Sequence, residues 1–181
     1  MRIARTAALL FATLAVASAT AARAEPATAS ASPGLGRLKA LAGEWAGTAK
    51  GGGGQAPQPT KASFRVVSGG SAVMLVTDPG TPHEMVTLFH EDDGALIATH
   101  YCAAMNQPRM KLAPAAAGDS LVFEFMDGTN LKSHPGRMQR LALATADPRR
   151  QTQSWTFADK DGTSGTMTME LTRADAPSPA K

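Results

Sequence analysis

The sequence contains very little cysteine. Its single cysteine, Cys102, has no partner within the chain, which excludes an internal disulfide framework. A lone thiol in an oxidising compartment is buried and inert, joins two chains, or acts as a nucleophile. Because Cys102 lies within an apolar strand pattern, we expect it to be buried.

Sequence signatures of catalysis are also absent. The chain has no Gly-x-Ser-x-Gly nucleophile elbow. The glycine run at 51–54 is followed by neither Gly-Lys-Ser/Thr nor a helical pattern, so it is not a phosphate-binding loop. Neither Trp45 nor Trp155 has charged neighbours at the spacing that glycoside hydrolysis needs. The sequence therefore supports no reaction class, although it does not exclude catalysis.

The N-terminus has the pattern of an export signal. Arg2 and Arg5 precede an apolar run at 7–17 that is too short to span a bilayer, and Ala22-Arg23-Ala24 is a small-x-small cleavage site. We expect a signal peptide at 1–24 and a periplasmic or secreted protein of a bacterial cell. The alternative is an uncleaved anchor helix. No cysteine follows the apolar run, so a lipid anchor is not expected.

The chain also lacks an excess of charge once the signal is removed. Residues 1–24 contain three arginines and no acidic residue. Of the 18 basic residues, cleavage therefore leaves as many as there are acidic residues, which number 15. A mature charge near zero gives no electrostatic reason to expect nucleic acid or an anionic membrane as a partner. The sequence leaves the oligomeric state open.

The mature sequence divides into a core and two short flanks. Residues 25–33 and 174–181 are rich in Ala, Ser, Thr and Pro, with no large apolar side chain to bury, so we expect a disordered lead-in and tail. The residues between them, 34–173, are enough for one hydrophobic core. We therefore expect one domain.

The core pattern predicts a short helix and then a meander of strands. Leu35, Leu38 and Leu41 form one helical face that ends at Gly43. Beyond it, Gly, Pro, Asp and Asn separate short apolar segments, and the connections are too short for crossover helices. We expect strands at 44–50, 61–68, 71–77, 84–90, 95–102, 109–113, 120–126, 137–145, 153–158 and 165–172.

Edge strands favour closure of such a meander. Because closure removes exposed edges, we expect an all-β, up-and-down antiparallel barrel of 8–10 strands after the helix. An open two-sheet sandwich is the alternative.

One segment gathers polar side chains around a strand end. Polar groups there can orient a ligand at a barrel mouth, and an arginine can bind a carboxylate. The alternative, of equal weight, is that Asn106 and Gln107 satisfy main-chain groups in a turn fixed by Pro108. Trp45 can close one end of the barrel or pack in the core. The candidate ligand-binding residues are His100, Tyr101, Asn106, Gln107, Arg109 and Trp45.

Histidine spacing does not predict a metal site. If residues 91–94 form a type I turn closed by Gly94, His90 lies opposite Leu96 and roughly 13 Å from His100 on the same face. That separation is too long for ligands of one ion. His100 and Cys102 have Cβ atoms roughly 7 Å apart, which is long for a catalytic thiol–imidazole pair. We expect no metal and no cofactor.

Two segments resemble known families. Leu41-Ala42-Gly43-Glu44-Trp45-Ala46-Gly47 resembles the first strand of lipocalin-like and fatty-acid-binding-like barrels, the calycin group. The segment 85–110 is similar to a family of uncharacterised bacterial exported proteins, which differ from this chain at Met105 and at Arg137-Met138-Gln139. The resemblance implies a lipocalin-like barrel with an interior cavity, and it implies no established activity. The missing histidines around Met138 speak against a metal or haem role.

The sequence therefore favours an exported barrel that binds a small, largely apolar ligand in its interior. A rival is a small hydrolase or isomerase with His100 as general base. A third hypothesis is a protein-interaction module whose barrel interior is filled by side chains.

Overall fold

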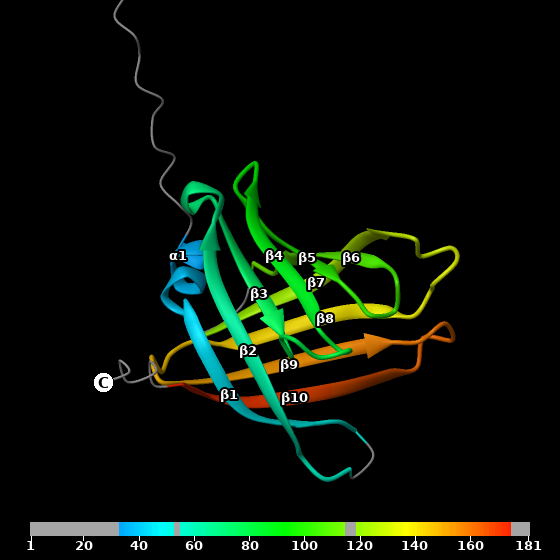
Figure 1. Ribbon diagram of the computed structural model, residues 1–181. Helices are drawn as coiled ribbons and strands as arrows, with labels where there is room; N and C mark the ends of the chain where they lie inside the picture. The colour runs from blue at the N-terminus through cyan, green and yellow to red at the C-terminus, as the bar shows by residue number, and fades with distance from the viewer. Residues whose placement is uncertain (1–32, 53–54, 115–118, 175–181) are drawn as a thin grey trace, which may run out of the picture.

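The computed structural model describes residues 33–52, 55–114 and 119–174 (Figure 1). The predicted signal peptide, the lead-in up to residue 32 and the tail from residue 175 lie outside this part of the chain. Helix α1 spans Pro33–Ala40 and the first strand begins at Gly43, close to the predicted helix and its end.

Ten antiparallel strands follow α1, and they agree with the predicted number and order. Several begin or end a few residues from the predicted limits. β2 begins at Gln58, so it contains Pro59 near its start, where a missing N–H is tolerated. The strands are β1 (Gly43–Lys50), β2 (Gln58–Val67), β3 (Ala72–Thr77), β4 (Met85–Asp92), β5 (Ala95–Tyr101), β6 (Gln107–Leu112), β7 (Ser120–Thr129), β8 (Arg137–Ala144), β9 (Arg150–Ala158) and β10 (Ser164–Arg173), with a 3-10 turn η1 (Ser68–Gly70) between β2 and β3.

The sheet closes into a barrel by pairing β1 with β10. Gly47 faces Leu171 across this seam, and a Cβ atom at Gly47 would lie 1.9 Å from the carbonyl oxygen of Glu170. Only glycine allows the two backbones to approach so closely. Closure confirms the predicted barrel and excludes the open sandwich.

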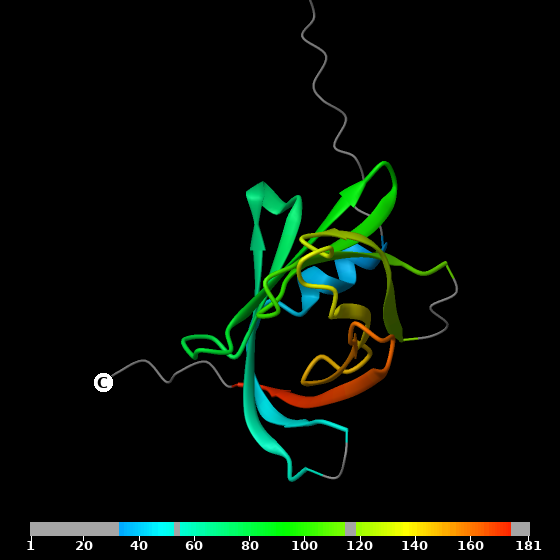
Figure 2. The same ribbon diagram turned by 90° about the vertical axis from the view of Figure 1, so that its right-hand side faces the viewer.

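The two ends of the barrel differ. Helix α1 lies across one end, which we call the helix end (Figure 2). Its buried side chains Leu35 and Leu38, with Leu41 just beyond, join the hydrophobic core. The other end, which we call the loop end, carries the connections β1–β2, β3–β4, β5–β6, β7–β8 and β9–β10.

The turn between β4 and β5 differs from the expected one. Asp93 and Gly94 have φ angles of 46° and 80°, the left-handed pair of a two-residue hairpin turn. This shorter turn shifts the register by one residue, so His90 faces Ile97 and Thr87 faces His100. The expected pairing of His90 with Leu96 is therefore wrong. Because successive side chains alternate between faces, His90 lies on the outer face and His100 on the inner one.

No helix in the described residues is long and apolar enough to cross a membrane.

Candidate functional site

His100 is the polar group at the centre of the candidate site. It lies near the loop end of β5, and only 1% of its surface is exposed. Its Nδ1 is 2.9 Å from the hydroxyl oxygen of Thr87 on β4. Its Nε2, at the tip of the ring, is buried and has no hydrogen-bond partner among the described residues. Buried polar atoms without a partner are uncommon and costly, by roughly 1–3 kcal/mol each.

Burial keeps His100 uncharged. Removing the ring from water lowers its pKa from 6.5 to about 4. The neutral imidazole has one N–H donor and one nitrogen lone pair, so Nδ1 is one of the two and Nε2 is the other, and Nδ1 is used by Thr87. Whichever tautomer is present, Nε2 retains an unused hydrogen-bonding capacity.

Trp155 forms the wall beside His100. The two ring centroids are 5.0 Å apart with an interplanar angle of 43°. The indole Nε1 donates to Oε1 of Gln153 at 3.0 Å, and Nε2 of Gln153 donates to Oε1 of Gln151 at 3.1 Å. All three side chains point inward from β9, and the bonds between them fix the indole against the imidazole.

The interior next to His100 is tightly packed. Thr87, Trp155 and Gln153 are each at most 2% exposed, so little solvent-sized space adjoins these side chains. Nearer the loop end the packing loosens, and half-buried side chains rest against the core. They are Ala49, Cys102, Phe157 and Met167.

Cys102 shares the inner face of its strand with His100. It is half-buried, so the prediction of a buried cysteine holds only in part. Burial raises the pKa of its thiol above the ordinary value. A thiol with a raised pKa is a weak nucleophile at neutral pH.

Asn106 serves the backbone of a distant loop. It is completely buried, and its Nδ2 donates to the carbonyl oxygens of His134 at 2.7 Å and Gly136 at 2.6 Å. These bonds hold the β7–β8 connection against the β5–β6 turn. Asn106 therefore satisfies main-chain groups, but they lie in the β7–β8 connection and not in its own turn as the alternative hypothesis expected. Its Oδ1 is buried without a partner among the described residues.

Arg109 and Tyr101 face outward. Arg109 forms an exposed two-point pair with Asp127, with donor–acceptor distances of 2.6 and 2.5 Å, and this hydrogen bonding holds the pKa of Asp127 below its usual value. Tyr101 is 47% exposed on the outer face of β5. Gln107 accepts a hydrogen bond from the hydroxyl of Thr129. These three side chains do not join His100 in the interior.

Trp45 lies at the helix end. Its Nε1 donates to the carbonyl oxygen of Leu41 at 2.9 Å, and the guanidinium of Arg173 lies 4.4 Å from its ring centroid. Of the six predicted site residues, only His100 therefore lies in the candidate site in the barrel interior. The structure adds three residues to that site: Thr87, Trp155 and Gln153. The only sequence signal for these three residues was the alternation of inward- and outward-facing side chains along a strand. That signal predicts burial, and it does not distinguish a binding site from a hydrophobic core.

The described residues contain no group of three or more His, Cys, Asp or Glu side chains that could hold a metal ion. The arrangement offers a neutral hydrogen-bonding atom, an aromatic wall and a half-buried apolar rim. This chemistry matches an uncharged polar group of a ligand, which would have to displace side chains that fill the interior. Burial lowers the pKa of His100 to about 4, so its imidazole is a weak proton acceptor at neutral pH.

Comparison with known proteins identifies the fold alone. A crystal structure of Rv2717c from M. tuberculosis matches with a TM-score of 0.54 and 17% sequence identity, over 79% of this chain and 98% of that one. No family model matches the chain, and no curated protein matches it.

Proposed function

We propose that this barrel binds a small, largely apolar molecule from its loop end, with the neutral imidazole of His100 as the polar contact. The observation that carries the proposal is the buried Nε2 of His100, which has no partner among the described residues. A ligand that supplies a hydrogen bond to Nε2 removes the cost of leaving that atom unpaired.

The charge of the interior supports an uncharged ligand. The buried polar side chains of the described residues are threonine, serine, histidine, asparagine and glutamine, with no lysine, arginine or carboxylate among them. A charged head group placed there would lose its hydration without gaining an ion pair. An alcohol, a phenol, a ketone or an amide on an apolar body fits better.

The loosened packing at the loop end supports the direction of access. Phe157, Met167 and Cys102 are half-buried and border the core above His100. Methionine is unbranched and flexible, so it can move aside at low cost. We infer that a ligand displaces these side chains to reach His100.

A second candidate is a protein-interaction module. The dense packing around His100 favours it, because a filled barrel leaves its outer face as the binding surface. Tyr101, Met105 and Met126 are 47%, 63% and 44% exposed and could contribute apolar contacts. The two candidates differ in whether a ligand reaches Trp155.

Single-tryptophan variants test the proposal. Trp45→Phe leaves Trp155 as the fluorescent reporter beside His100, and Trp155→Phe leaves Trp45 at the helix end. Each is titrated with 1-octanol, octanoate and octylammonium, which share one chain and differ in head group. We expect saturable changes with 1-octanol in the Trp155 reporter, weaker changes with the charged homologues, and little change in the Trp45 reporter.

His100→Phe is the matched site variant, because it keeps an aromatic ring and removes Nε2. We expect it to weaken 1-octanol binding at least about tenfold while circular dichroism remains that of the barrel. Arg109→Ala, on the outer face, is the control and should bind as the parent does. Equal responses from both reporters, or unchanged binding in His100→Phe, would reject the interior site and favour the interaction module.

We also propose that the protein acts after export. The support is the basic start, the short apolar run and the small-x-small site before Glu25. Fractionation of a bacterial host with mass analysis of the N-terminus tests this. We expect mature protein beginning at Glu25 in the periplasm or medium, and uncleaved protein in the cytoplasm would contradict export.

A further inference from the structure

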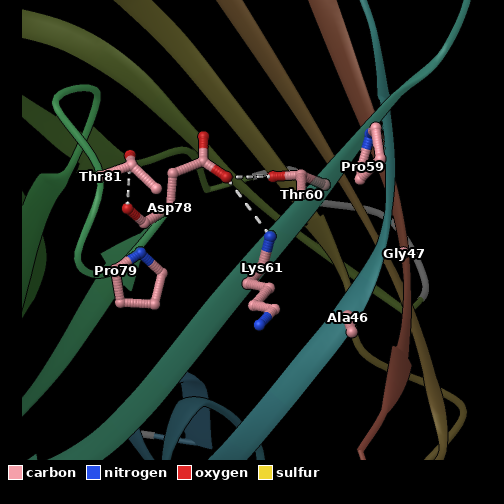
Figure 3. A pocket seen from close by; sticks show the side chains of 8 residues that line it. All are labelled: Ala46, Gly47, Pro59, Thr60, Lys61, Asp78, Pro79 and Thr81. Atoms are coloured by element: carbon pink, nitrogen blue, oxygen red, sulfur yellow. Dashed lines mark hydrogen bonds between the residues drawn. The ribbon is translucent and has the colours of Figure 1, made fainter.

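A pocket lies away from His100, between β1, β2 and the β3–β4 connection (Figure 3). Its volume is about 290 Å³, at the lower end of the range for small-molecule sites. Much of its wall is apolar and comes from Ala46, Gly47, Pro59 and Pro79. One acidic side chain, Asp78, lines it together with Thr60.

The carboxylate of Asp78 is held in a fixed position. Its Oδ1 accepts hydrogen bonds from the Thr60 hydroxyl at 2.7 Å and from the backbone N–H of Lys61 at 3.3 Å. The backbone N–H of Asp78 donates to the carbonyl of Lys61, and its carbonyl accepts from Thr81. Oδ2 has no partner among the described residues, so one oxygen remains free to bind.

The backbone of Asp78 also adopts an uncommon conformation. Its φ angle is +49°, in the left-handed region that a residue with a side chain seldom adopts. Such positions persist where surrounding contacts determine them, and they gather at binding sites. Here the contacts to Thr60, Lys61 and Thr81 determine it.

No neighbouring cation neutralises this carboxylate in the described part of the chain. Lys61 lines the same pocket, yet its side chain extends away from Asp78, whereas its backbone nitrogen faces the carboxylate (Figure 3). Two ion pairs, Arg109 with Asp127 and Arg140 with Glu124, lie on other strands. The pocket therefore combines one uncompensated negative charge with an apolar wall.

We propose that this pocket binds a small organic cation, an ammonium group on a compact apolar body. The ammonium donates to Oδ2 of Asp78, and the apolar body packs against Pro59 and Pro79. A charge-assisted hydrogen bond to a pre-positioned carboxylate is stronger than one between neutral groups. A metal ion fits less well, because hard cations take six or more oxygen ligands and this pocket offers one carboxylate.

The pocket is independent of the site beside His100. Asp78 follows the end of β3, and its contacts are to β2 and its own turn. Ligand binding at Asp78 can therefore be tested independently of the proposed function.

A head-group comparison by NMR tests the proposal. The full-length protein is titrated with benzylammonium, benzyl alcohol and benzoate, and backbone amide shifts are followed. Benzylammonium should shift Gly47, Thr60 and Thr81 and bind at least about tenfold more tightly than the other two compounds. Equal binding of benzyl alcohol, or shifts that avoid these amides, would overturn the proposal without any variant.

Asp78→Asn supplies the site variant, because asparagine keeps Oδ1 as an acceptor and tolerates a positive φ. It should weaken benzylammonium binding at least about tenfold. Glu84→Gln is the matched control: Glu84 accepts a hydrogen bond from Gly80 in the same connection and does not line the pocket. Unchanged binding in Asp78→Asn, or an equal loss in Glu84→Gln, would reject Asp78 as the anchor.

Discussion

The helix end and the loop end of this barrel bury different chemistry. At the helix end, Leu35, Leu38 and Leu41 fill the opening, and Trp45 has its N–H satisfied by a backbone carbonyl. Towards the loop end the inner face carries Thr60, Thr77, Thr87 and His100, and polar atoms of His100 and Asn106 lack partners among the described residues. Hydrophobic burial dominates the first end, although Nε2 of Gln151 near the start of β9 is also unpaired there among the described residues. The second end holds more of the buried polar atoms that lack partners in the described part of the chain.

We expect this difference to assign stability mainly to the helix end of the sheet and binding mainly to the loop end. A well-packed apolar end contributes stability, so the opposite end can tolerate unpaired polar atoms and half-buried side chains. If this division is right, substitutions at the helix end mainly change stability. Substitutions at the loop end mainly change binding, pH dependence and local motion.

Leu38→Ala should have the largest effect on stability. Leu38 is completely buried in α1, and removing its side chain leaves a cavity where the helix meets the barrel. We expect the free energy of unfolding to fall by about 4 kcal/mol, measured by urea denaturation. Gly36→Ala is the control: nothing lies within 4 Å of its added Cβ atom, so a gain of about 0.5 kcal/mol is expected. A loss below about 1 kcal/mol for Leu38→Ala would contradict the division.

His100 should make stability depend on pH in a defined window. The folded protein holds the pKa of His100 at about 4, below its ordinary 6.5, so the unfolded chain binds the proton more readily. The contribution of His100 to the free energy of unfolding is fully present above pH 6.5. It is lost as pH falls from 6.5 towards 4, by up to about 3 kcal/mol.

The measurement compares the wild type with His100→Gln at pH 7 and pH 4.5 by denaturant unfolding. Other ionisable groups contribute to both proteins, so the difference between them isolates His100. The wild type should lose more stability than the variant. Equal losses would show that His100 is not held neutral by burial.

Asn106→Ala should loosen the loop end. It removes the donors to the carbonyls of His134 and Gly136 and leaves both without that bond, at a cost of about 2 kcal/mol. Amide hydrogen exchange should rise in the β7–β8 connection and stay unchanged in α1. Exchange that rises uniformly over the barrel would instead mean that Asn106 supports the whole fold.

Arg109→Ala should have the smallest effect. Arg109 is exposed, and its pair with Asp127 lies in water on the outer face. We expect unfolding and octanol binding close to those of the wild type, and a slightly weaker dependence of stability on salt. A marked loss of binding would place the ligand on the outer face and favour the interaction module.

The strand order could be predicted because turn residues and strand alternation are local signals. The turn at Asp93-Gly94 shows where such prediction fails, because a two-residue turn and a longer turn favour the same residue types. Which of the two turns forms shifts every cross-strand pair of β4 and β5 by one residue. The partners of Asn106 lie 28 and 30 residues further along the chain, so no local pattern reveals them.

The candidate site was harder to predict than the fold. The polar segment 100–109 crosses a turn that directs His100 inward and Arg109 outward, and sequence proximity does not show this. Thr87 meets His100 through the register of β4 and β5, and Trp155 on β9 meets it only because the barrel closes. Asp78 lies between the strands predicted at 71–77 and 84–90, and its pocket arises only when the β3–β4 connection meets β1 and β2.

Imidazole nitrogen NMR of His100 is the most direct test of a neutral, ligand-accessible group in the barrel interior. At neutral pH the account predicts an uncharged ring whose Nε2 resonance moves on addition of 1-octanol, while Nδ1, bonded to Thr87, moves less. A charged ring, or an Nε2 resonance unaffected by saturating 1-octanol, would contradict it.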